Sequence, residues 1–276
     1  MKPRYLYYAV GEGLVRTLPR SVSIFLSRAL AWAYHRFFFA KDRAALRGNL
    51  EAAGGEASEL IANFARYFLD LFYSRRLSKK FIQNHVEIRG LPFLERALAG
   101  KKGVILASAH VGNWELGGMV LAKLGFPVTG VALRHGDPKI EKLFQRRRQK
   151  NGLDVIYLGN SLRKCYNVLK ENKILVLNAD RAFTGRTVPV LFLGREVNFP
   201  AGIARFRRAT GAEILPCFFV MKDSARYFLD IEPPLAALDE RGTVQSFATR
   251  LEQRIKQCPT QWFVFRPYWE TPNLPA

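Results

Sequence analysis

His110 and Glu115 are the two residues of this chain whose types and spacing could do chemistry. They are the first and last residues of the stretch His-Val-Gly-Asn-Trp-Glu. This stretch follows an apolar run at 103–109, which we predict to be a buried strand, and leads into a predicted helix at 114–124. A carboxylate that holds one nitrogen of a histidine leaves the other nitrogen to take a proton from a hydroxyl. Because Glu115 would lie about one turn into the helix, we expect its carboxylate to reach back to His110. The pair is therefore predicted to be a general base that activates an alcohol.

The two residues also have plainer interpretations. A histidine near a strand end is commonly structural, and a glutamate in the first turn of a helix can simply complement the helix dipole. The neighbours favour a site, since Trp114 adds an aromatic wall and Asn113 lies beside it, and we predict that both contact substrate. The chain contains no G-x-S-x-G motif, so we expect direct attack by a substrate hydroxyl and no covalent enzyme intermediate.

A second group of polar residues follows two further predicted strands. Asp180 and Arg181 come directly after the apolar run 174–179, and Arg134 comes after 128–133. If these strands are parallel, all three residues emerge at the same sheet edge as His110. We expect Asp180 and Arg181 to contact substrate, with a turn or cap role as the alternative for Asp180. Arg134 could hold a phosphate or a developing oxyanion, or be a solvated side chain.

Strand-like and helical patterns alternate along most of the chain, which is typical of a mostly parallel sheet covered by helices. We predict an α/β fold with a single domain over residues 41–276, preceded by a helical segment at 1–40. Residues 41–73 are predicted to be helical and 81–89 to be an edge strand. The other predicted strands are 104–109, 128–133, 154–158, 174–179, 188–193, 214–221 and 227–231, and the other predicted helices are 91–99, 114–124, 138–150, 161–171, 202–210 and 243–257.

The segment 1–40 is rich in aromatic and aliphatic residues but is interrupted by charges such as Arg28 and Arg36. It contains no apolar run of about 18 residues, so the sequence supports neither a simple membrane-spanning helix nor a cleavable signal peptide. A basic, aromatic-rich amphipathic helix suits a membrane interface. We therefore expect residues 1–40 to associate with a membrane, with packing on the catalytic domain as the alternative.

The charge balance is strongly basic, with 43 Lys and Arg against 23 Asp and Glu, a net charge of +20. Such a surface attracts nucleic acid or anionic lipid. Basic clusters such as 146–148 and 205–208 are usually solvated helix faces, and no nucleic-acid motif accompanies them, so nucleic acid is the less favoured partner. The three cysteines are isolated and the four histidines do not cluster, so we predict neither a disulfide framework nor a metal site.

Several short motifs along the chain occur in the order seen in one enzyme family. In its motifs the chain resembles the lipid A late acyltransferases, the lauroyl and myristoyl transferases, and the related phosphatidylinositol mannoside acyltransferases. The motifs are Ala109-His-Val-Gly-Asn-Trp-Glu-Leu-Gly117, Arg134 before Asp137-Pro138, Arg148-x-x-x-Gly152, Asn178-Ala-Asp180, Phe192-Leu-Gly194, Pro200-x-Gly202, Thr210-Gly211-Ala212 before Pro216, and Pro259-x-x-Trp262.

The resemblance implies a glycerolipid acyltransferase-like fold. It also implies acyl transfer from a thioester of acyl carrier protein or coenzyme A to a hydroxyl of an anionic membrane lipid, with no other cofactor. His110 matches the catalytic histidine of the family, Glu115 its acidic partner and Arg134 a basic residue needed for activity. The residues that match the substrate-binding regions are Arg148, Asp180, Phe192, Gly194 and Arg195.

The same resemblance implies late acylation of a lipid A precursor, in lipopolysaccharide biosynthesis, by a peripheral or monotopic protein on the cytoplasmic face of the inner membrane. Two alternatives remain at this point: an acyltransferase for another phospho- or glycolipid, and a non-catalytic basic protein that binds lipid or nucleic acid.

Overall fold

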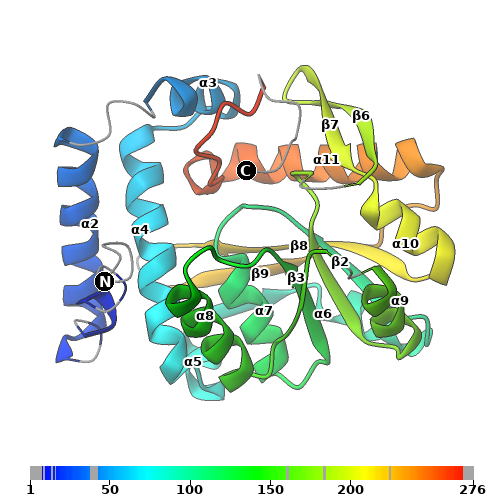
Figure 1. The fold of residues 1–276 in the computed structure, drawn as a ribbon, viewed down its shortest axis with the longest axis horizontal. Coiled ribbons are helices and arrows are strands. Elements are labelled where there is room, and N and C mark those ends of the chain that lie inside the picture. Colours follow the sequence, from blue (N-terminus) through cyan, green and yellow to red (C-terminus); the bar gives the residue numbers. More distant parts are fainter. Residues whose placement is uncertain are drawn as a thin grey trace.

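A twisted seven-stranded sheet forms the centre of the molecule (Figure 1). The computed structural model describes residues 8, 10–13, 15, 17–37, 43–159, 162–182, 185–223 and 225–269. The strand order is β1-β9-β8-β2-β5-β3-β4. In chain order the strands are β1 Val86–Arg89, β2 Val104–Ser108, β3 Val128–Ala132, β4 Asp154–Tyr157, β5 Ile174–Asn178, β8 Glu213–Met221 and β9 Tyr227–Ile231.

The sheet is parallel except where β9 runs antiparallel to β8. Strands β8, β2, β5, β3 and β4 therefore end at one common edge, and β1 pairs in parallel with β9 at the far side. The predicted α/β fold with a mostly parallel sheet is confirmed. The predicted strand 188–193 belongs instead to a separate antiparallel hairpin, β6 Thr187–Phe192 with β7 Arg195–Pro200.

Helices cover both faces of the sheet, and strand alternation divides the core between them. Along β2, Val104 and Leu106 belong to one hydrophobic cluster, whereas Ile105 and Ala107 belong to the other. The first cluster is covered by α4 Ala57–Tyr73, α5 Lys79–His85, α6 Leu91–Ala99, α7 Trp114–Lys123 and α8 Pro138–Lys150. The second is covered by α9 Leu162–Lys170, α10 Gly202–Thr210, α11 Glu240–Gln257 and the β6–β7 hairpin.

Two predicted elements differ from the structure for local reasons. The predicted strand 81–89 begins as helix α5, because the hydroxyl of Ser78 caps that helix by accepting a hydrogen bond from the backbone N–H of Phe81. Only its second half is strand β1. The predicted helix 41–73 is two helices, α3 Arg43–Ala53 and α4, because Gly54 takes a left-handed conformation with φ of 80° and ends the first helix.

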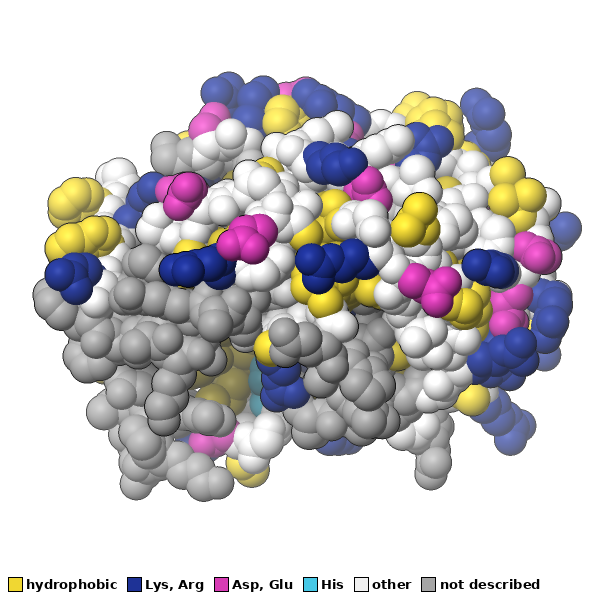
Figure 2. All heavy atoms as spheres, turned by 90° about the horizontal axis from the view of Figure 1, so that it is seen from above, with side chains coloured by type: hydrophobic (Ala, Val, Ile, Leu, Met, Phe, Trp, Pro, Cys, Tyr) yellow, Lys and Arg dark blue, Asp and Glu magenta, His cyan; other side chains and the backbone are white. Residues whose placement is uncertain are grey.

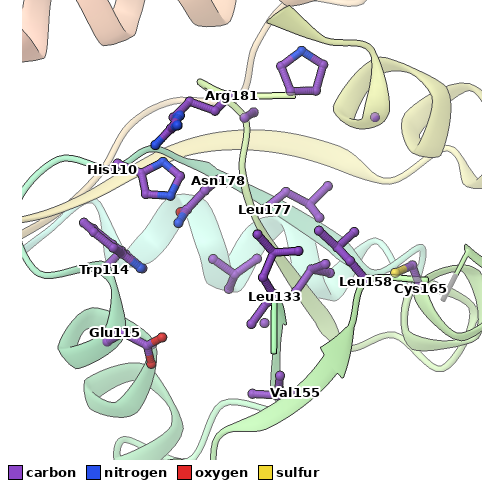
Figure 3. A pocket seen from close by; sticks show the side chains of 18 of the residues that line it. His110, Trp114, Glu115, Leu133, Val155, Leu158, Cys165, Leu177, Asn178 and Arg181 are labelled. Carbon is purple, nitrogen blue, oxygen red and sulfur yellow. The ribbon is translucent and has the colours of Figure 1, made fainter. Parts of the chain in front are cut away.

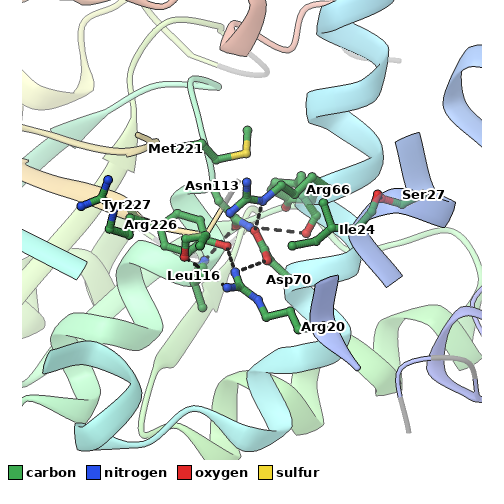
Figure 4. Close-up of polar contacts among 12 residues, drawn as sticks. Arg20, Ile24, Ser27, Arg66, Asp70, Asn113, Leu116, Met221, Arg226 and Tyr227 are labelled. Atoms are coloured by element: carbon green, nitrogen blue, oxygen red, sulfur yellow. Dashed lines mark hydrogen bonds and ion pairs between the residues drawn. The ribbon is translucent and has the colours of Figure 1, made fainter. Parts of the chain in front are cut away.

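Helix α2 Arg20–Phe37 lies along α4 and is joined to it by a buried charge cluster (Figure 4). The carboxylate of Asp70 on α4 is 2% exposed and lies 3.5 Å from the guanidinium of Arg20 and 3.8 Å from that of Arg66. Arg20 also donates a hydrogen bond of 2.6 Å to the hydroxyl of Tyr227 on β9. The cluster therefore connects α2, α4 and the sheet. None of the described helices is both long and apolar enough to span a bilayer.

Replacing Asp70 with Ala should lower the free energy of unfolding by about 3–5 kcal/mol, because the buried guanidinium of Arg66 loses its counter-ion. Urea denaturation followed by circular dichroism measures this. The matched control is Arg28→Ala, which removes an exposed ion pair with Glu59 and should cost less than about 1 kcal/mol. Equal effects of the two substitutions would contradict an organising role for the Asp70 cluster.

Candidate active site

His110 and Asp180 meet at the edge of the sheet where the parallel strands end. The ring Nδ1 of His110 lies 2.8 Å from Asp180 Oδ1, and the backbone N–H of His110 donates to Asp180 Oδ2 at 3.0 Å. The strand register produces this pairing: Ser108 on β2 faces Asn178 on β5, so the residues two positions further along face each other as well. The side chain of Asp180 is completely buried, whereas that of His110 is 16% exposed.

The buried Asp180 carries a negative charge. Burial alone would raise the pKa of its carboxyl, but attraction to His110 and the hydrogen bonds from the ring and backbone of His110 outweigh burial and lower the pKa below its ordinary value. An ionised carboxylate can only accept hydrogen bonds, so Nδ1 of His110 carries the proton in this contact. Proton transfer to or from a substrate would then use Nε2.

Backbone hydrogen bonds fix the position of His110 and of the turn between β2 and α7. The backbone N–H of Phe263 donates to the carbonyl of His110 at 2.8 Å, and the backbone N–H of Asn113 donates to the carbonyl of Phe219 at 2.7 Å. Between them Gly112 has φ of 63°, and a Cβ atom there would lie 2.1 Å from the carbonyl oxygen of Phe219. Only glycine fits, which explains this residue in the motif.

Glu115 does not pair with His110, which corrects the prediction from the sequence. Its carboxylate makes a bidentate ion pair with the guanidinium of Arg148 on α8; one of the two hydrogen bonds, from Nε to Oε2, is 3.0 Å long. The physical reason is the register described above, which brings Asp180 to the histidine, while the first turn of α7 points Glu115 toward α8. Burial would lower the pKa of Arg148, but its hydrogen bonds and attraction to Glu115 outweigh burial and raise that pKa, so Arg148 keeps its positive charge.

Both His110 and the Glu115–Arg148 pair line a largely apolar cavity of about 730 Å³ (Figure 3). Seen from above, a histidine side chain is visible in a hollow of the surface, beside hydrophobic and basic groups (Figure 2). The ring of Trp114 meets that of His110 edge to face, with 4.9 Å between centroids. Other side chains of the lining are Tyr67, Leu133, Val155, Leu158, Cys165, Val176, Leu177, Ile203 and Phe206.

The predicted site residues divide into two groups. The first group lines the cavity and consists of Trp114, Glu115, Arg148 and Arg181. Asp180 contacts His110, which also lines the cavity. The side chain of Asn113 caps α7 by accepting a hydrogen bond of 3.0 Å from the backbone N–H of Leu116, and its contact with substrate stays a prediction.

The remaining predicted residues are not among the described residues of the cavity lining. Phe192, the last residue of β6, is fully buried and packs against the ring of Trp262, and its role in substrate binding stays a prediction. Gly194 lies in the hairpin turn, and Arg195 lies 5.0 Å from the ring centre of Trp269. Exposed Arg134 lies 4.1 Å from the ring centre of Tyr157. Roles for Gly194, Arg195 and Arg134 in substrate binding or catalysis stay predictions.

Some residues of the site carry no motif that sequence reasoning could detect. The hydroxyl of Tyr268 donates to the backbone carbonyl of Asp180 at 2.6 Å, and Tyr67 on α4 packs 4.8 Å from the ring of Trp114. Both lie far from His110 in sequence, Tyr67 on a helix with an ordinary apolar pattern and Tyr268 in a turn. Within the described part of the chain, no three His, Cys, Asp or Glu residues gather in a group that could hold a metal ion.

The fold and the site together define an α/β protein with a histidine–aspartate pair beside an apolar cavity. The chain belongs to the bacterial lipid A biosynthesis acyltransferase family, whose model matches residues 2–271, and it is an acyltransferase. It is 31% identical to a phosphatidylinositol mannoside acyltransferase of Mycobacterium tuberculosis over 76% of this chain and 68% of that one.

Two further relatives match over more of their length. A phosphatidylinositol mannoside acyltransferase of Mycolicibacterium smegmatis is 28% identical over 96% of this chain and 90% of that one. A lipid A biosynthesis palmitoleoyltransferase of Escherichia coli is 25% identical over 95% and 90%. The relatives thus include proteins named for two different lipid acceptors, and the predicted resemblance to this family is confirmed.

Replacing Asp180 with Asn should reduce the rate of acyl transfer by about 10²- to 10⁴-fold, because the amide no longer stabilises a protonated His110 and can impose the other tautomer. Initial rates with a radiolabelled acyl donor measure the loss. Asp154→Asn is the matched control, because it makes the same substitution at an exposed residue outside the cavity lining and should leave the rate within a few-fold of wild type. A rate for Asp180→Asn that equals the control would show that the carboxylate does not support His110.

Proposed function

We propose that the protein transfers a fatty acyl chain from an acyl thioester to a hydroxyl group of a membrane lipid, with His110 as general base. The observation that carries the proposal is the contact of 2.8 Å between His110 Nδ1 and the buried carboxylate of Asp180 beside an apolar cavity. A cavity of this size and character suits a hydrocarbon chain. Membership of the acyltransferase family supports the reaction type.

The reaction needs one proton to move twice. His110 Nε2 takes the proton of the acceptor hydroxyl while its oxygen forms a bond to the thioester carbonyl carbon. The tetrahedral intermediate then collapses, the carbon–sulfur bond breaks, and the imidazolium returns the proton to the departing thiolate. The charge of Asp180 stabilises the imidazolium between the two steps. No electrons are gained or lost.

The oxyanion of the intermediate needs positive charge close to His110. Helix α7 begins at Trp114, only four residues after the histidine, and the N-terminal end of a helix carries partial positive charge. Arg181 follows Asp180 and lines the cavity. These groups would act at the carbonyl, and Arg134 on the exposed loop after β3 would contact a phosphate of a substrate.

The acceptor in this proposal is an anionic glycolipid or phospholipid. The relatives are named for phosphatidylinositol mannosides and for lipid A, both of which are acceptors to be tested. A net charge of +20 favours a phosphorylated acceptor, an anionic membrane and an acidic donor such as acyl carrier protein or coenzyme A. Late acylation of a lipid A precursor on the cytoplasmic face of the inner membrane stays the favoured form of this prediction.

A lipid A precursor and a phosphatidylinositol mannoside are tested as acceptors with the wild type. Replacing His110 with Ala should abolish transfer to the acceptor that the wild type acylates, because no base remains to take the proton. Mass spectrometry of the lipid products measures the loss, and an unchanged unfolding midpoint shows that the variant folds. Retained transfer would overturn the role of His110. Absence of transfer by the wild type with either acceptor, despite lipid binding, would favour a non-catalytic lipid-binding protein.

We further propose that helix α2 binds the membrane surface. Its outward face carries Val22, Phe25 and Trp32 at helical spacing, and the latter two are 70% and 61% exposed. Leu30 points in another direction from the same helix and is 65% exposed. Large apolar side chains in water next to arginines are typical of a helix that lies in a membrane interface.

Replacing Phe25 and Trp32 together with Ser should weaken binding to vesicles of phosphatidylglycerol and phosphatidylcholine by at least about tenfold, since each large side chain would contribute about 1.5–3 kcal/mol on burial. Co-sedimentation with the vesicles measures binding. Leu238→Ser is the matched control, because Leu238 is 53% exposed in the segment before α11. Unchanged binding of the double variant would place the membrane contact elsewhere.

A further inference from the structure

The cavity reaches both faces of the sheet, so it has two arms. Lining residues alternate sides along β3: Gly130 lies on the same face as Val128, which packs toward α7, whereas Val131 packs toward α9 and α10. Glu115 and Cys165 mark opposite ends of the pocket in Figure 3. We name the two parts the α7 arm and the α10 arm. His110 lies where they meet, beyond the end of β2.

The two arms differ in charge. The α7 arm is lined by aromatic and aliphatic side chains, and the charges of Glu115 and Arg148 neutralise each other there. The α10 arm contains Arg205 on α10 and Arg186, whose backbone carbonyl accepts from the N–H of Ala201 beside that helix. A neutral, largely apolar arm suits a hydrocarbon chain, and an arm with arginines at its edge suits the anionic headgroup of an acceptor.

Gly130 leaves an opening in the wall of the α7 arm. A Cβ atom at Gly130 would meet no atom within 4 Å, and the backbone there is not left-handed. On the opposite wall, a Cβ atom at Gly118 would already lie 3.2 Å from the side chain of Leu153. The arm is therefore closely packed beside Gly118 and open beside Gly130, so a side chain placed at Gly130 would extend into open cavity space without displacing a neighbour.

The depth of Gly130 matches the length of a common fatty acyl chain. Gly130 on β3 pairs with Val176 on β5, and Val176 pairs with Leu106 on β2. Leu106 precedes His110 by four residues. At about 3.3 Å per residue along the strands and about 4.8 Å between strands, Gly130 lies roughly 16 Å from His110. An extended chain advances about 1.2 Å per bond, judged from the span of an extended polypeptide, so this distance corresponds to roughly a dozen carbon atoms.

We propose that Gly130 sets the upper limit on the acyl chain length, with the chain lying in the α7 arm and the acceptor in the α10 arm. The inference rests on the proposed acyl transfer and goes beyond it by naming the residue that selects the donor. A side chain at Gly130 would occupy the space of the last methylene groups. Each methylene that is excluded from the cavity should cost a long donor about fourfold in binding.

The test is a competition among even-numbered acyl thioesters from octanoyl to stearoyl, with mass spectrometry of the products. Gly130→Ala and Gly130→Val should shift the products progressively toward shorter chains, and the valine variant should change the ratio of the longest wild-type product to the one two carbons shorter by at least about tenfold. Valine suits a β-strand, so both variants should fold. The matched control is Val131→Phe, which enlarges the neighbouring side chain in the α10 arm and should alter the KM for the acceptor while leaving the distribution of chain lengths unchanged.

Three results separate the possible failures. If the wild type transfers acyl chains and both Gly130 variants keep its product distribution, the role of Gly130 is wrong. If Val131→Phe shortens the products and Gly130→Val does not, the acyl chain lies in the α10 arm and the assignment of the arms is overturned. If the wild type transfers no chain from any donor, the proposed function itself fails.

Discussion

The pairing of β2 with β5 is the constraint on which the site depends. Because β2 and β5 are adjacent, parallel and end at the same level, they bring His110 and Asp180 into contact directly after the strands. The carboxylate can remain ionised without exposure because the ring and the backbone of His110 both donate hydrogen bonds to it and Arg181 adds a positive charge nearby. Much else near the site supports this geometry, including the left-handed Gly112 and the hydrogen bond from Tyr268.

The carboxylate that contacts His110 is not the one that the local motif indicates. Glu115 is five residues from His110 in sequence and Asp180 is seventy residues away, yet the distant carboxylate makes the contact. Glu115 instead neutralises Arg148, a buried cation that would otherwise lack a counter-ion. Two acidic residues thus have separate tasks: one holds the histidine, and the other keeps a nearby arginine in the cavity wall without a net charge.

Sequence reasoning predicted the parts of the fold that depend on local periodicity. The strands and helices from 91 to 178 lie within a residue or two of the predicted ranges, and the shared edge of His110 and Asp180 followed from parallel strands. It could not predict which strands are neighbours, because the order β2-β5-β3 depends on tertiary packing, and so it paired His110 with the wrong carboxylate. For the same reason it did not predict that the side chain of Phe192 is buried against Trp262. An apolar residue in a motif does not reveal which way it faces.

Helix α4 serves two regions of the molecule that are far apart along the chain. Asp70 near its end contacts Arg20 of α2, and one turn earlier the ring of Tyr67 lies against Trp114 in the cavity wall. A single helix is stiff over this distance. If α2 rests on a bilayer as proposed, α4 would fix the direction in which the cavity faces relative to the lipid surface. A lipid substrate would then enter the cavity at a defined angle.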